Sequence, residues 1–279
     1  MTTASIVTHK TPAKQLNKAL KCLLKSSMDK VFIIDNSPTD DLERCLPSDE
    51  KIEYLHVSNN GFGAGHNVAI KKAFELEARY HLVMNADVWW EDSVIEKMTA
   101  FLDVSPEVGI ISPKIFYPDG DLQYSCRMLP TPLDLFAKRF LPAKISRKNN
   151  RRYMLAGHDH DYDLNVPYLL GSFLLFRMEA LKDTGLFDER FFMYPEDIDI
   201  TRRIHEKWQT LYWPHVSIVH EHQAASRKNF KMLAIHLVNM IKYFNKWGWV
   251  FDKGRKEFNN DLKRNIKQLK PGKLQKGRG

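Results

Sequence analysis

The chain of 279 residues is 43% hydrophobic, which is enough apolar material for a folded core and excludes an intrinsically disordered protein. Its formal net charge is +8, yet residues 252–279 alone hold ten Lys and Arg against three Asp and Glu, so the rest of the chain is nearly neutral. The basic character therefore belongs to one end of the chain, which argues against a nucleic-acid-binding protein.

Short apolar strands alternate with helices through the first 105 residues. The run at 31–34 is apolar at every position, as in parallel sheets that are buried on both faces. Ligands bind such sheets at the carboxyl ends of the strands, and Asp35 lies at such an end. The expected strands are 4–8, 31–34, 53–57 and 81–84; the expected helices are 11–24, capped by Thr11, then one ending at Arg79 and one at 91–104.

Three glycines, Gly61, Gly63 and Gly65, follow the third strand within the segment 59–67. Glycine lets the backbone approach a ligand closely where a strand turns into a helix. The spacing is not that of the dinucleotide-binding fingerprint, and the segment lies in the third unit rather than the first. A ligand-binding loop and a plain tight turn are equally good interpretations.

Asp87 lies just beyond the fourth strand, and His220 ends a later strand expected at 216–219. A carboxylate at the tip of a buried strand is costly without a partner, and Mg²⁺ commonly takes only one or two protein carboxylates together with substrate phosphates. These two side chains could therefore hold a divalent cation. The alternatives are an N-cap or Asx turn for Asp87 and an ordinary loop histidine for His220.

Three acids, Glu196, Asp197 and Asp199, follow Pro195 at the expected start of a helix. Acids there meet the positive end of the helix dipole, and proline suits a first helical turn. Residues two apart on a helix do not share a face, so one of Asp197 and Asp199 can face a cleft while the other braces the fold. A helix start with favourable charges is the simpler alternative.

The helical and strand periodicities are lost between residues 122 and 165, which indicates functional or mobile loops in a compact domain. The cluster His158–Asp161 within this stretch is a weak candidate for a metal site. The chain then returns to the core as a strand or short helix at 166–177. A helix at 178–189, ended by Gly185, leads to the three acids.

Apolar residues recur at helical spacing between Phe230 and Phe251, with lysines among them. This pattern predicts an amphipathic helix that either lies on an anionic membrane or packs on the domain. No apolar run reaches the ~20 residues needed to span a bilayer, and the first residues do not resemble a signal peptide. Three scattered cysteines without a CxxC pair favour a reducing compartment, so we expect a cytoplasmic protein, peripheral on the inner face of the cell membrane.

Eight short motifs occur in order along residues 4–250: 6–8, 33–37, 59–63, 84–88, 171–173, 185–189, 192–199 and 219–220. Each is weak alone. Together they resemble the family 2 inverting glycosyltransferases with a GT-A fold, most closely the bacterial rhamnosyltransferase-like members. The implied fold class is α/β, with a Rossmann-like, mostly parallel sheet flanked by helices, followed by a C-terminal amphipathic helix and a basic tail.

The resemblance implies a role for each matched position. Asp197 would be the catalytic base, with Glu196 beside it, and we expect Asp197 to be exposed and ionised with a pKa of about 4. Asp87 and His220 would bind Mg²⁺ or Mn²⁺, since Asn85 replaces the first acid of the family's metal-binding motif. The positions expected to contact the donor nucleotide sugar are Thr8, Asp35, Asn36, Asn60, Gly61, Gly63, Asn67 and Asn85.

The implied reaction moves a sugar, with rhamnose as the first candidate, from a nucleoside-diphosphate donor to a glycan or lipid-linked acceptor in surface polysaccharide (O-antigen or capsule) biosynthesis. One carboxylate base and one displacement give inversion, without a glycosyl-enzyme intermediate. The alternative is an inactive nucleotide-sugar-binding module in a glycan-assembly complex, against which the intact Asp87, Asp197 and His220 argue. An anionic membrane surface is the further expected partner, and nucleic acid is not.

The expected organisation is one catalytic domain followed by two short segments. The catalytic domain would cover residues 1–225, with a nucleotide-binding half at about 1–120 and an acceptor half at about 121–225. The amphipathic helix would cover 226–251 and the basic tail 252–279.

Overall fold

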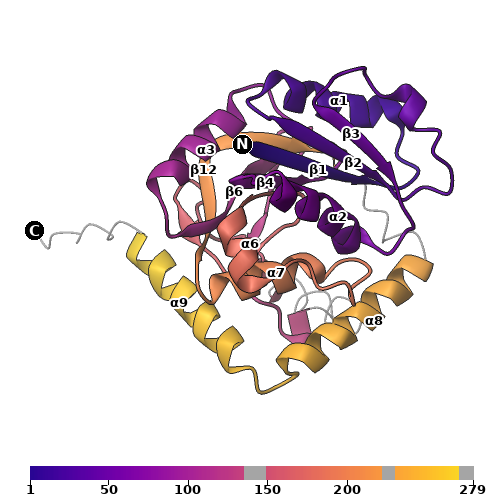
Figure 1. Cartoon of the computed structure of the whole chain (residues 1–279). Helices are drawn as coiled ribbons and strands as arrows, with labels where there is room; N and C mark the ends of the chain where they lie inside the picture. The colour runs from indigo at the N-terminus through magenta and orange to yellow at the C-terminus, as the bar shows by residue number, and fades with distance from the viewer. Residues whose placement is uncertain (135–148, 222–229, 270–279) are drawn as a thin grey trace, which may run out of the picture.

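The computed structural model describes residues 1–134, 149–221 and 230–269, and a large sheet forms their centre (Figure 1). Ten strands of this described part join the sheet, whose main path runs β3-β2-β1-β4-β11-β6-β12-β5, while β7 pairs with β6 and β9 with β12. Strands β10 and β8 form a separate pair.

The elements follow the predicted alternation of strands and helices. The strands are β1 Thr2–Thr8, β2 Lys30–Asp35, β3 Ile52–His56, β4 Tyr80–Met84, β5 Val88–Trp89, β6 Val108–Phe116, β7 Leu122–Gln123, β8 Cys126–Arg127, β9 Leu164–Asn165, β10 Tyr168–Leu169, β11 Phe173–Arg177 and β12 Gln209–His220. The helices are α1 Ala13–Lys25, α2 Phe62–Glu75, α3 Val94–Val104, α6 Met178–Thr184, α7 Glu196–His205, α8 Phe230–Trp247 and α9 Lys253–Leu269, with a 3₁₀ turn at Glu43–Cys45.

Helices cover both faces of the sheet, as the continuous apolar strands predict. Helices α1 and α3 pack on one face, and α2, α6 and α7 pack on the other. In α1 the side chains of Leu16, Leu20 and Leu23 are fully buried, and burial of each contributes about 1.5–3 kcal/mol. The prediction of a mostly parallel α/β sheet flanked by helices is confirmed.

The polar ends of the strands gather at one edge of the sheet. Strands β3, β2, β1 and β4 are parallel neighbours, so their carboxyl ends meet there. Strand β11 runs antiparallel to β4, so its beginning arrives at the same edge, where the backbone N–H of Asn85 donates to the carbonyl of Ser172 over 3.0 Å. Strand β12 also ends there, because His220 pairs with Val88 just beyond β4. Residues from distant parts of the chain are thereby brought together.

The structure corrects one local expectation and resolves two others. Helix α1 begins at Ala13 with Pro12 as its N-cap, and Thr11 does not cap it; the Thr11 hydroxyl instead accepts from the backbone N–H of His9 over 3.4 Å. The segment 166–177 forms strands β10 and β11 rather than a helix. Short strands occur in the stretch 122–165, of which residues 135–148 lie outside the described part.

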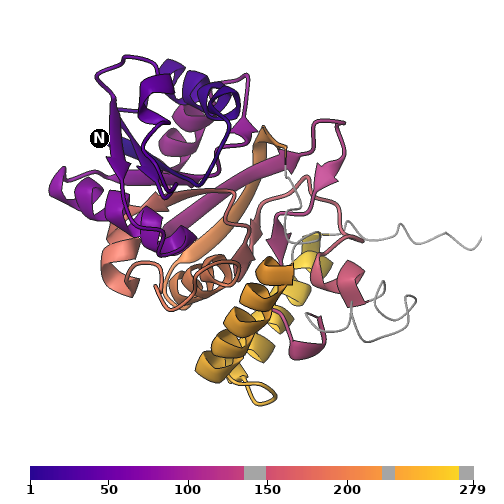
Figure 2. The same cartoon turned by 90° about the vertical axis from the view of Figure 1, so that its right-hand side faces the viewer.

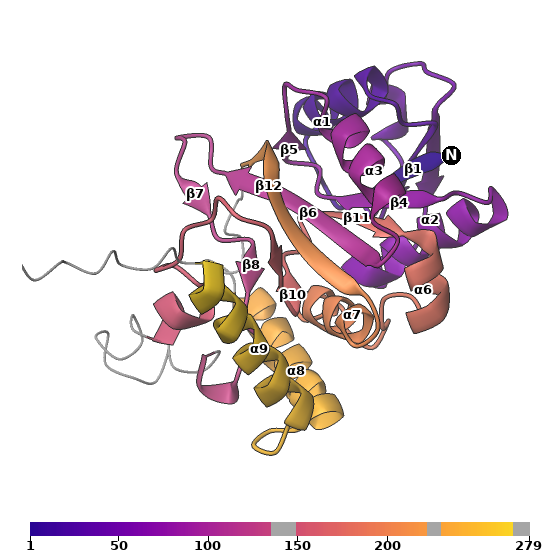
Figure 3. The same ribbon diagram turned by 90° about the vertical axis from the view of Figure 1, so that its left-hand side faces the viewer.

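The C-terminal region differs from the expected helix and tail. Helix α8 confirms the predicted helix, and its residues Met240, Tyr243 and Phe244 are at most 2% exposed, so one face packs on the domain. Residues 253–269 form a second helix, α9, rather than a basic tail. Helices α8 and α9 diverge from the corner that joins them (Figure 1), and both lie at the end of the molecule beyond α7 (Figures 2 and 3). Residues 226–229 and 270–279 lie outside the described part.

Side-chain contacts explain why α9 is helical despite its charge. Asn259 donates to the carbonyl of Leu129 over 2.9 Å and accepts from the Leu129 N–H over 2.8 Å. Leu262 is 1% exposed, and Arg255 and Asn259 are buried. One face of α9 is therefore part of the domain. None of the helices in the described residues is long and apolar enough to cross a bilayer.

Candidate active site

A buried carboxylate, that of Asp35, is the centre of a polar cluster at the ends of β1 and β2. The Thr8 hydroxyl and the Ser37 N–H donate to its Oδ1 over 3.0 and 2.9 Å, and the Tyr54 hydroxyl donates to its Oδ2 over 2.8 Å. Burial alone would raise the pKa of Asp35, but these hydrogen bonds outweigh it and lower the pKa. The carboxylate is therefore ionised at neutral pH and has lone pairs left for ligand donors.

Asn36 follows Asp35 directly in the chain, and Asn60 lies in the loop between β3 and α2. The backbone N–H of Asn36 donates to the carbonyl of Thr8 over 2.8 Å. Its side-chain Oδ1 is buried and has no hydrogen-bond partner within the described part of the chain, which leaves an acceptor for a ligand. Asn60 is exposed, and its backbone N–H donates to the carbonyl of Ser58 over 3.0 Å. Both residues stay candidates for donor contacts.

The glycines at the start of α2 are required by protein packing. Gly61 has a φ of 107°, and a Cβ at this position would lie 2.3 Å from the carbonyl oxygen of Phe192. A Cβ at Gly63 would lie 2.9 Å from the Cβ of Phe187. Any larger residue would push the segment before α7 away, so the tight-turn interpretation accounts for both glycines.

Asn67, expected to contact the donor, forms hydrogen bonds within the protein. Its amide nitrogen donates to the carbonyl of Phe187 over 2.9 Å and to the carboxylate of Glu189 over 2.9 Å, while its oxygen accepts from the Phe187 N–H over 3.0 Å. The side chain is buried. Asn67 therefore ties α2 to the turn after α6, and its contact with the donor stays a prediction.

Asp87 and His220 lie together, as the strand ends predicted. Asp87 Oδ1 is 3.2 Å from His220 Nε2, and the Asn85 side-chain nitrogen is 3.3 Å from the same Nε2. The other ring nitrogen, Nδ1, lies 2.7 Å from Oε1 of Gln123. An amide oxygen can only accept, so Nδ1 carries the hydrogen. In the neutral ring Nε2 consequently has a lone pair that accepts from the Asn85 amide, and the Asp87 carboxylate lies against the same nitrogen.

This arrangement fits a divalent cation. A ring lone pair and a carboxylate oxygen repel each other unless a proton or a metal ion lies between them. Adjacent ligands of an octahedral cation with bonds of about 2.1 Å lie about 3 Å apart, close to the 3.2 Å between Asp87 and His220. No group of three or more His, Cys, Asp or Glu suited to a metal occurs in the described ranges, so a cation here needs further ligands from Asn85, substrate or water.

The His158–Asp161 cluster does not converge on a metal site. His160 is buried, with its ring nitrogens 3.5 Å from the Cys126 sulfur and 3.2 Å from the Leu155 carbonyl oxygen. Asp161 forms an ion pair with Lys114. The two side chains therefore serve separate contacts within the domain.

Asp197 is the second residue of α7 and is 7% exposed. Its Oδ2 accepts from the backbone N–H of Gly171 over 3.0 Å and from the Tyr168 hydroxyl over 3.2 Å. Its Oδ1 accepts from the N–H of Ile198 over 2.8 Å. Three donors thus fix the orientation of this carboxylate.

The dipeptide Gly171–Ser172 joins the two acidic sites. Gly171 donates to Asp197, and the Ser172 carbonyl accepts from the N–H of Asn85. A Cβ at Gly171 would lie 3.0 Å from the Cβ of Asp197, so only glycine allows this approach without displacement. The carboxylate of Asp197 and the Asn85–Asp87–His220 cluster are consequently held in a fixed relation at one edge of the sheet.

Burial changes the titration of both neighbouring acids. Burial raises the pKa of Asp197 to about 6, against the opposing effects of the Gly171 hydrogen bond and the positive charge of Arg127. Burial and the Asp197 charge raise the pKa of Glu196 well above its ordinary value, and Glu196 Oε2 has no hydrogen-bond partner among the described residues. The expectation of an exposed aspartate with a pKa of about 4 is therefore wrong.

Two residues beside Asp197 were not predicted. Tyr168 donates to it, and the Arg127 guanidinium lies 5.7 Å from the Tyr168 ring and 5.9 Å from the Tyr153 ring. Tyr168 lies three residues before the Gly171–Ser172 motif, so its nearness to that motif in the sequence was a signal for it. Arg127 and Gln123 lie in the stretch without periodicity, where no pattern indicates them.

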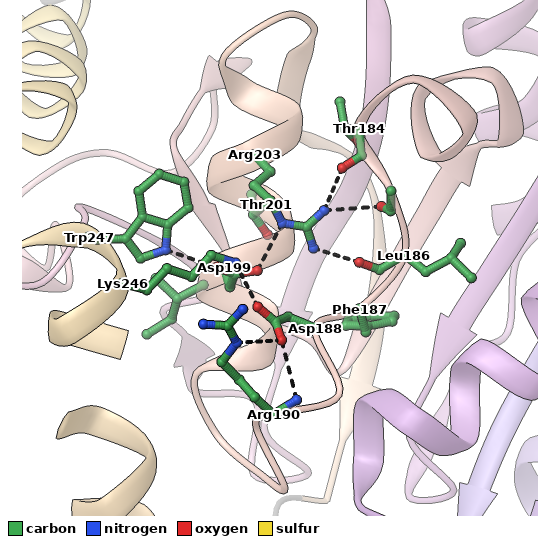
Figure 4. A network of polar contacts seen from close by, with 12 residues as sticks. Thr184, Leu186, Phe187, Asp188, Arg190, Asp199, Thr201, Arg203, Lys246 and Trp247 are labelled. Carbon is green, nitrogen blue, oxygen red and sulfur yellow. Dashed lines mark hydrogen bonds and ion pairs between the residues drawn. The ribbon is translucent and has the colours of Figure 1, made fainter. Parts of the chain in front are cut away.

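Asp199 links α7 to side chains of α8 and, through Arg203, to the end of α6 (Figure 4). Its Oδ2 accepts from Arg203 over 2.9 Å, and its Oδ1 lies 2.7 Å from the Lys246 ammonium and accepts from the Trp247 indole over 2.8 Å. The Arg203 guanidinium also donates to three carbonyls at the end of α6: Thr184, Gly185 and Leu186. The prediction that Asp197 and Asp199 diverge is confirmed.

Comparison with known proteins adds a family and several relatives. The model of the family described as glycosyl transferase family 2 matches residues 3–185. Over 211 residues the chain is 28% identical to N-acetylglucosaminyl-diphospho-decaprenol L-rhamnosyltransferase of Mycobacterium tuberculosis, covering 70% of this chain and 67% of that protein. It is 26% identical over 182 residues to the low-salt glycan biosynthesis hexosyltransferase Agl10 of Haloferax volcanii, covering 64% of this chain and 54% of that protein.

Solved structures with the same fold include two sugar-transferring enzymes. The mannosyltransferase PcManGT from Pyrobaculum calidifontis, in complex with GDP-Man and Mn²⁺, has a TM-score of 0.61 at 14% identity, covering 95% of this chain and 68% of that one. GalNAc-T7 with UDP, GalNAc and Mn²⁺ has a TM-score of 0.62 at 12% identity, covering 94% of this chain and 55% of that one. At these identities the likeness concerns the fold.

Proposed function

The chain belongs to glycosyl transferase family 2, and from that premise we propose that it is an inverting, metal-dependent hexosyltransferase that uses a nucleoside-diphosphate sugar. The observation that carries this proposal is the Gly171–Ser172 link, which places Asp197 and the Asn85–Asp87–His220 cluster at one edge of the sheet. A metal-binding cluster and a base in fixed relation are what displacement of a nucleoside diphosphate by a hydroxyl requires.

The donor would lie along the carboxyl edge of the sheet. The ionised Asp35 carboxylate, oriented by Thr8 and Tyr54, would accept from N–H or O–H groups of the nucleoside. The buried Oδ1 of Asn36 is a further acceptor beside it. Asp87 and His220, with Asn85, would hold Mg²⁺ or Mn²⁺, which supplies positive charge to the diphosphate leaving group.

Asp197 would act as the general base. As the acceptor oxygen forms its bond to the anomeric carbon, the acceptor O–H proton passes to Asp197, and the bond between that carbon and the diphosphate oxygen breaks. One displacement inverts the anomeric configuration. With a pKa of about 6, Asp197 is mostly ionised at pH 7 and still basic enough to take the proton.

The relatives support one substrate class. The Mycobacterium tuberculosis protein is named for transfer of L-rhamnose to N-acetylglucosaminyl-diphospho-decaprenol, and the Haloferax volcanii protein is named for glycan biosynthesis. We therefore propose rhamnose as the first sugar to test and a lipid-linked glycan as the acceptor, in surface glycan synthesis at the inner face of the membrane.

The test is a donor panel. Purified full-length chain is mixed with a series of nucleotide sugars, dTDP-rhamnose included, in Mn²⁺ or EDTA, and release of nucleoside diphosphate is measured together with calorimetric binding. Release from one donor, lost in EDTA, supports the proposal. Binding without release in the presence of lipid-linked acceptors favours an inactive nucleotide-sugar-binding module. Absence of binding to every donor contradicts the assigned site.

Replacing Asp87 with Ala should remove the metal dependence of donor binding. The variant loses the negatively charged ligand of the proposed cation, so its donor affinity in Mn²⁺ should fall to the affinity that the wild type has in EDTA. Calorimetry with and without Mn²⁺ measures this directly. Asp92→Ala, at an exposed acid beyond the same strand, is the matched control and should retain the Mn²⁺ effect. An Mn²⁺ effect that survives in Asp87→Ala contradicts the ligand assignment.

The acidic side of the plot of kcat/KM against pH, its acid limb, should report the ionisation of Asp197. Its pKa of about 6 predicts that kcat/KM rises with pH around pH 6. Tyr168→Phe removes a hydrogen bond to the charged form, so the limb should move to higher pH while donor affinity stays unchanged. Tyr162→Phe, an exposed tyrosine, is the control. A limb near pH 4, or one that does not move in Tyr168→Phe, would count against Asp197 as the titrating base.

A further inference from the structure

Helix α8 and the corner after it expose apolar side chains to an unusual extent. On α8, Val238 and Ile241 are 51% and 44% exposed. At the corner, Trp249, Val250 and Phe251 are 39%, 76% and 94% exposed. Positions 238, 241 and 245 are three or four residues apart and form one stripe on α8, opposite its buried face, while residues 249–251 follow the end of the helix at Trp247.

The corner is held in place by the protein. Buried Arg255 donates to the carbonyls of Gly248, Trp249 and Val250 over 3.1–3.4 Å. The Trp249 indole donates to Asn245 over 2.8 Å. Gly248 has a φ of 102°, and a Cβ there would lie 2.5 Å from a backbone oxygen of the same corner. The fold therefore fixes a backbone that presents apolar side chains to the outside.

Basic side chains surround this apolar tip. A hollow of about 650 Å³ beside the corner is lined by Val250 and Phe251 together with Lys253, Lys256 and Lys263 of α9. The two carboxylates in the hollow are already paired, Asp134 with Arg152 at 3.2 Å and Asp252 with Arg202 at 2.6 Å. The surplus charge of the hollow is therefore positive.

We propose that the exposed face of α8, the corner 249–251 and the lysines of α9 form a docking surface for an anionic lipid bilayer. Exposed aromatic and aliphatic side chains beside lysines are the pattern that enters the interface of an anionic membrane, with the ammonium groups at the lipid phosphates. Charge complementarity favours this occupant over a neutral apolar protein surface. Helices α8 and α9 project together from the domain, with the corner at their far end (Figure 3).

The position of this surface suits a lipid-linked acceptor. Asn239 of α8 donates to the carbonyl of Met193 over 3.0 Å, and Lys242 donates to the carbonyl of Arg190 over 2.9 Å. Both carbonyls belong to the segment that leads into α7 and Asp197. A docked bilayer would thus lie next to the acceptor side of the site. This last step rests on the proposed function, whereas lipid binding itself does not.

Vesicle co-sedimentation of the full chain, without donor or acceptor, tests the docking surface. Vesicles of phosphatidylcholine alone are compared with vesicles of phosphatidylcholine and phosphatidylglycerol. We expect stronger binding to the anionic vesicles, and a loss of at least roughly tenfold in Val250→Ser/Phe251→Ser. In Lys253→Gln/Lys256→Gln the preference for anionic vesicles should fall by roughly fivefold per lysine.

Matched variants elsewhere serve as controls. Val104→Ser, at a 78% exposed apolar residue ending α3, and Lys14→Gln/Lys21→Gln on α1 should bind as the wild type does. If the corner variant does not fold, Val238→Ser/Ile241→Ser replaces it. Lack of wild-type binding, or equal binding by the corner variant, overturns the proposal. A dimer in light scattering that the corner variant abolishes overturns it in favour of a protein interface. Donor binding is measured in a separate assay and tests the proposed function independently of the docking surface.

Discussion

Replacing Asp197 with Asn should reduce sugar transfer by roughly 100- to 10,000-fold while donor affinity stays close to that of the wild type. The change keeps the shape of the side chain but removes the group that would accept the acceptor proton. Thr8 and Asp35, which we propose contact the donor, and the Asp87–His220 pair are not altered. Turnover at saturating donor and acceptor, with calorimetric donor binding on the same preparation, measures both quantities.

The neighbouring acid provides an internal comparison. Glu196 is equally buried, but its pKa is raised well above the ordinary value and its Oε2 has no partner in the described structure, so the neutral form is favoured. Glu196→Gln imitates that neutral form and should cost far less activity than Asp197→Asn. If Glu196→Gln proves to be the inactive variant and Asp197→Asn retains turnover, the two roles are exchanged and the mechanism proposed above is wrong.

The strands were predictable from local apolar patterns. The closeness of Asp87 and His220 was predictable from the rule that neighbouring parallel strands end at one edge of the sheet. Apolar runs buried on both faces predict a mostly parallel sheet, and the carboxyl ends of such strands share an edge. Polar residues directly after strands must therefore meet. The 3.2 Å separation of Asp87 and His220 confirms that expectation for two residues that lie almost half the chain length apart in sequence.

The state of Asp197 was not predictable, because it depends on contacts between distant segments. Burial among distant segments raises its pKa, and Gly171, Arg127 and Tyr168, none of which is close to it in sequence, oppose that rise. The hydrogen bonds between the Asn67 amide and Phe187 were not predictable for the same reason. A sequence pattern identifies which groups carry chemistry, whereas packing decides which of them are free to use it.

The C-terminal helices show a different limit. Composition describes residues 252–279 as basic, yet an acid in this segment, Asp252, forms a buried ion pair with Arg202 of α7. The Arg202 guanidinium donates to both oxygens of Asp252 over 2.7 and 2.6 Å and lies 3.9 Å from the centre of the Trp247 ring. Net charge counts could not reveal this contact, which joins α7, α8 and the start of α9 in one arrangement.

Replacing Asp252 with Ala should lower the free energy of unfolding by about 3–5 kcal/mol, the second large effect that we expect. Both side chains of the pair are at most 3% exposed, so the variant leaves the Arg202 charge buried without its partner. Thermal and urea unfolding measure the loss. Asp261→Ala is the matched control on α9, because the Asp261–Arg264 pair is largely exposed and such pairs contribute about 0–1 kcal/mol.

The pH dependence of this loss provides a second check. Burial alone would raise the pKa of Asp252, but the hydrogen bonds from Arg202 and Arg255 outweigh it and lower the pKa below its ordinary 3.8. The stabilisation is therefore fully present above that value and is lost as the pH falls through the lower folded-state pKa. The difference in free energy of unfolding between the wild type and Asp252→Ala should accordingly become smaller in strong acid. If Asp252→Ala unfolds like Asp261→Ala at neutral pH, the ion pair does not anchor α9, and the fixed corner proposed to dock on lipid loses its support.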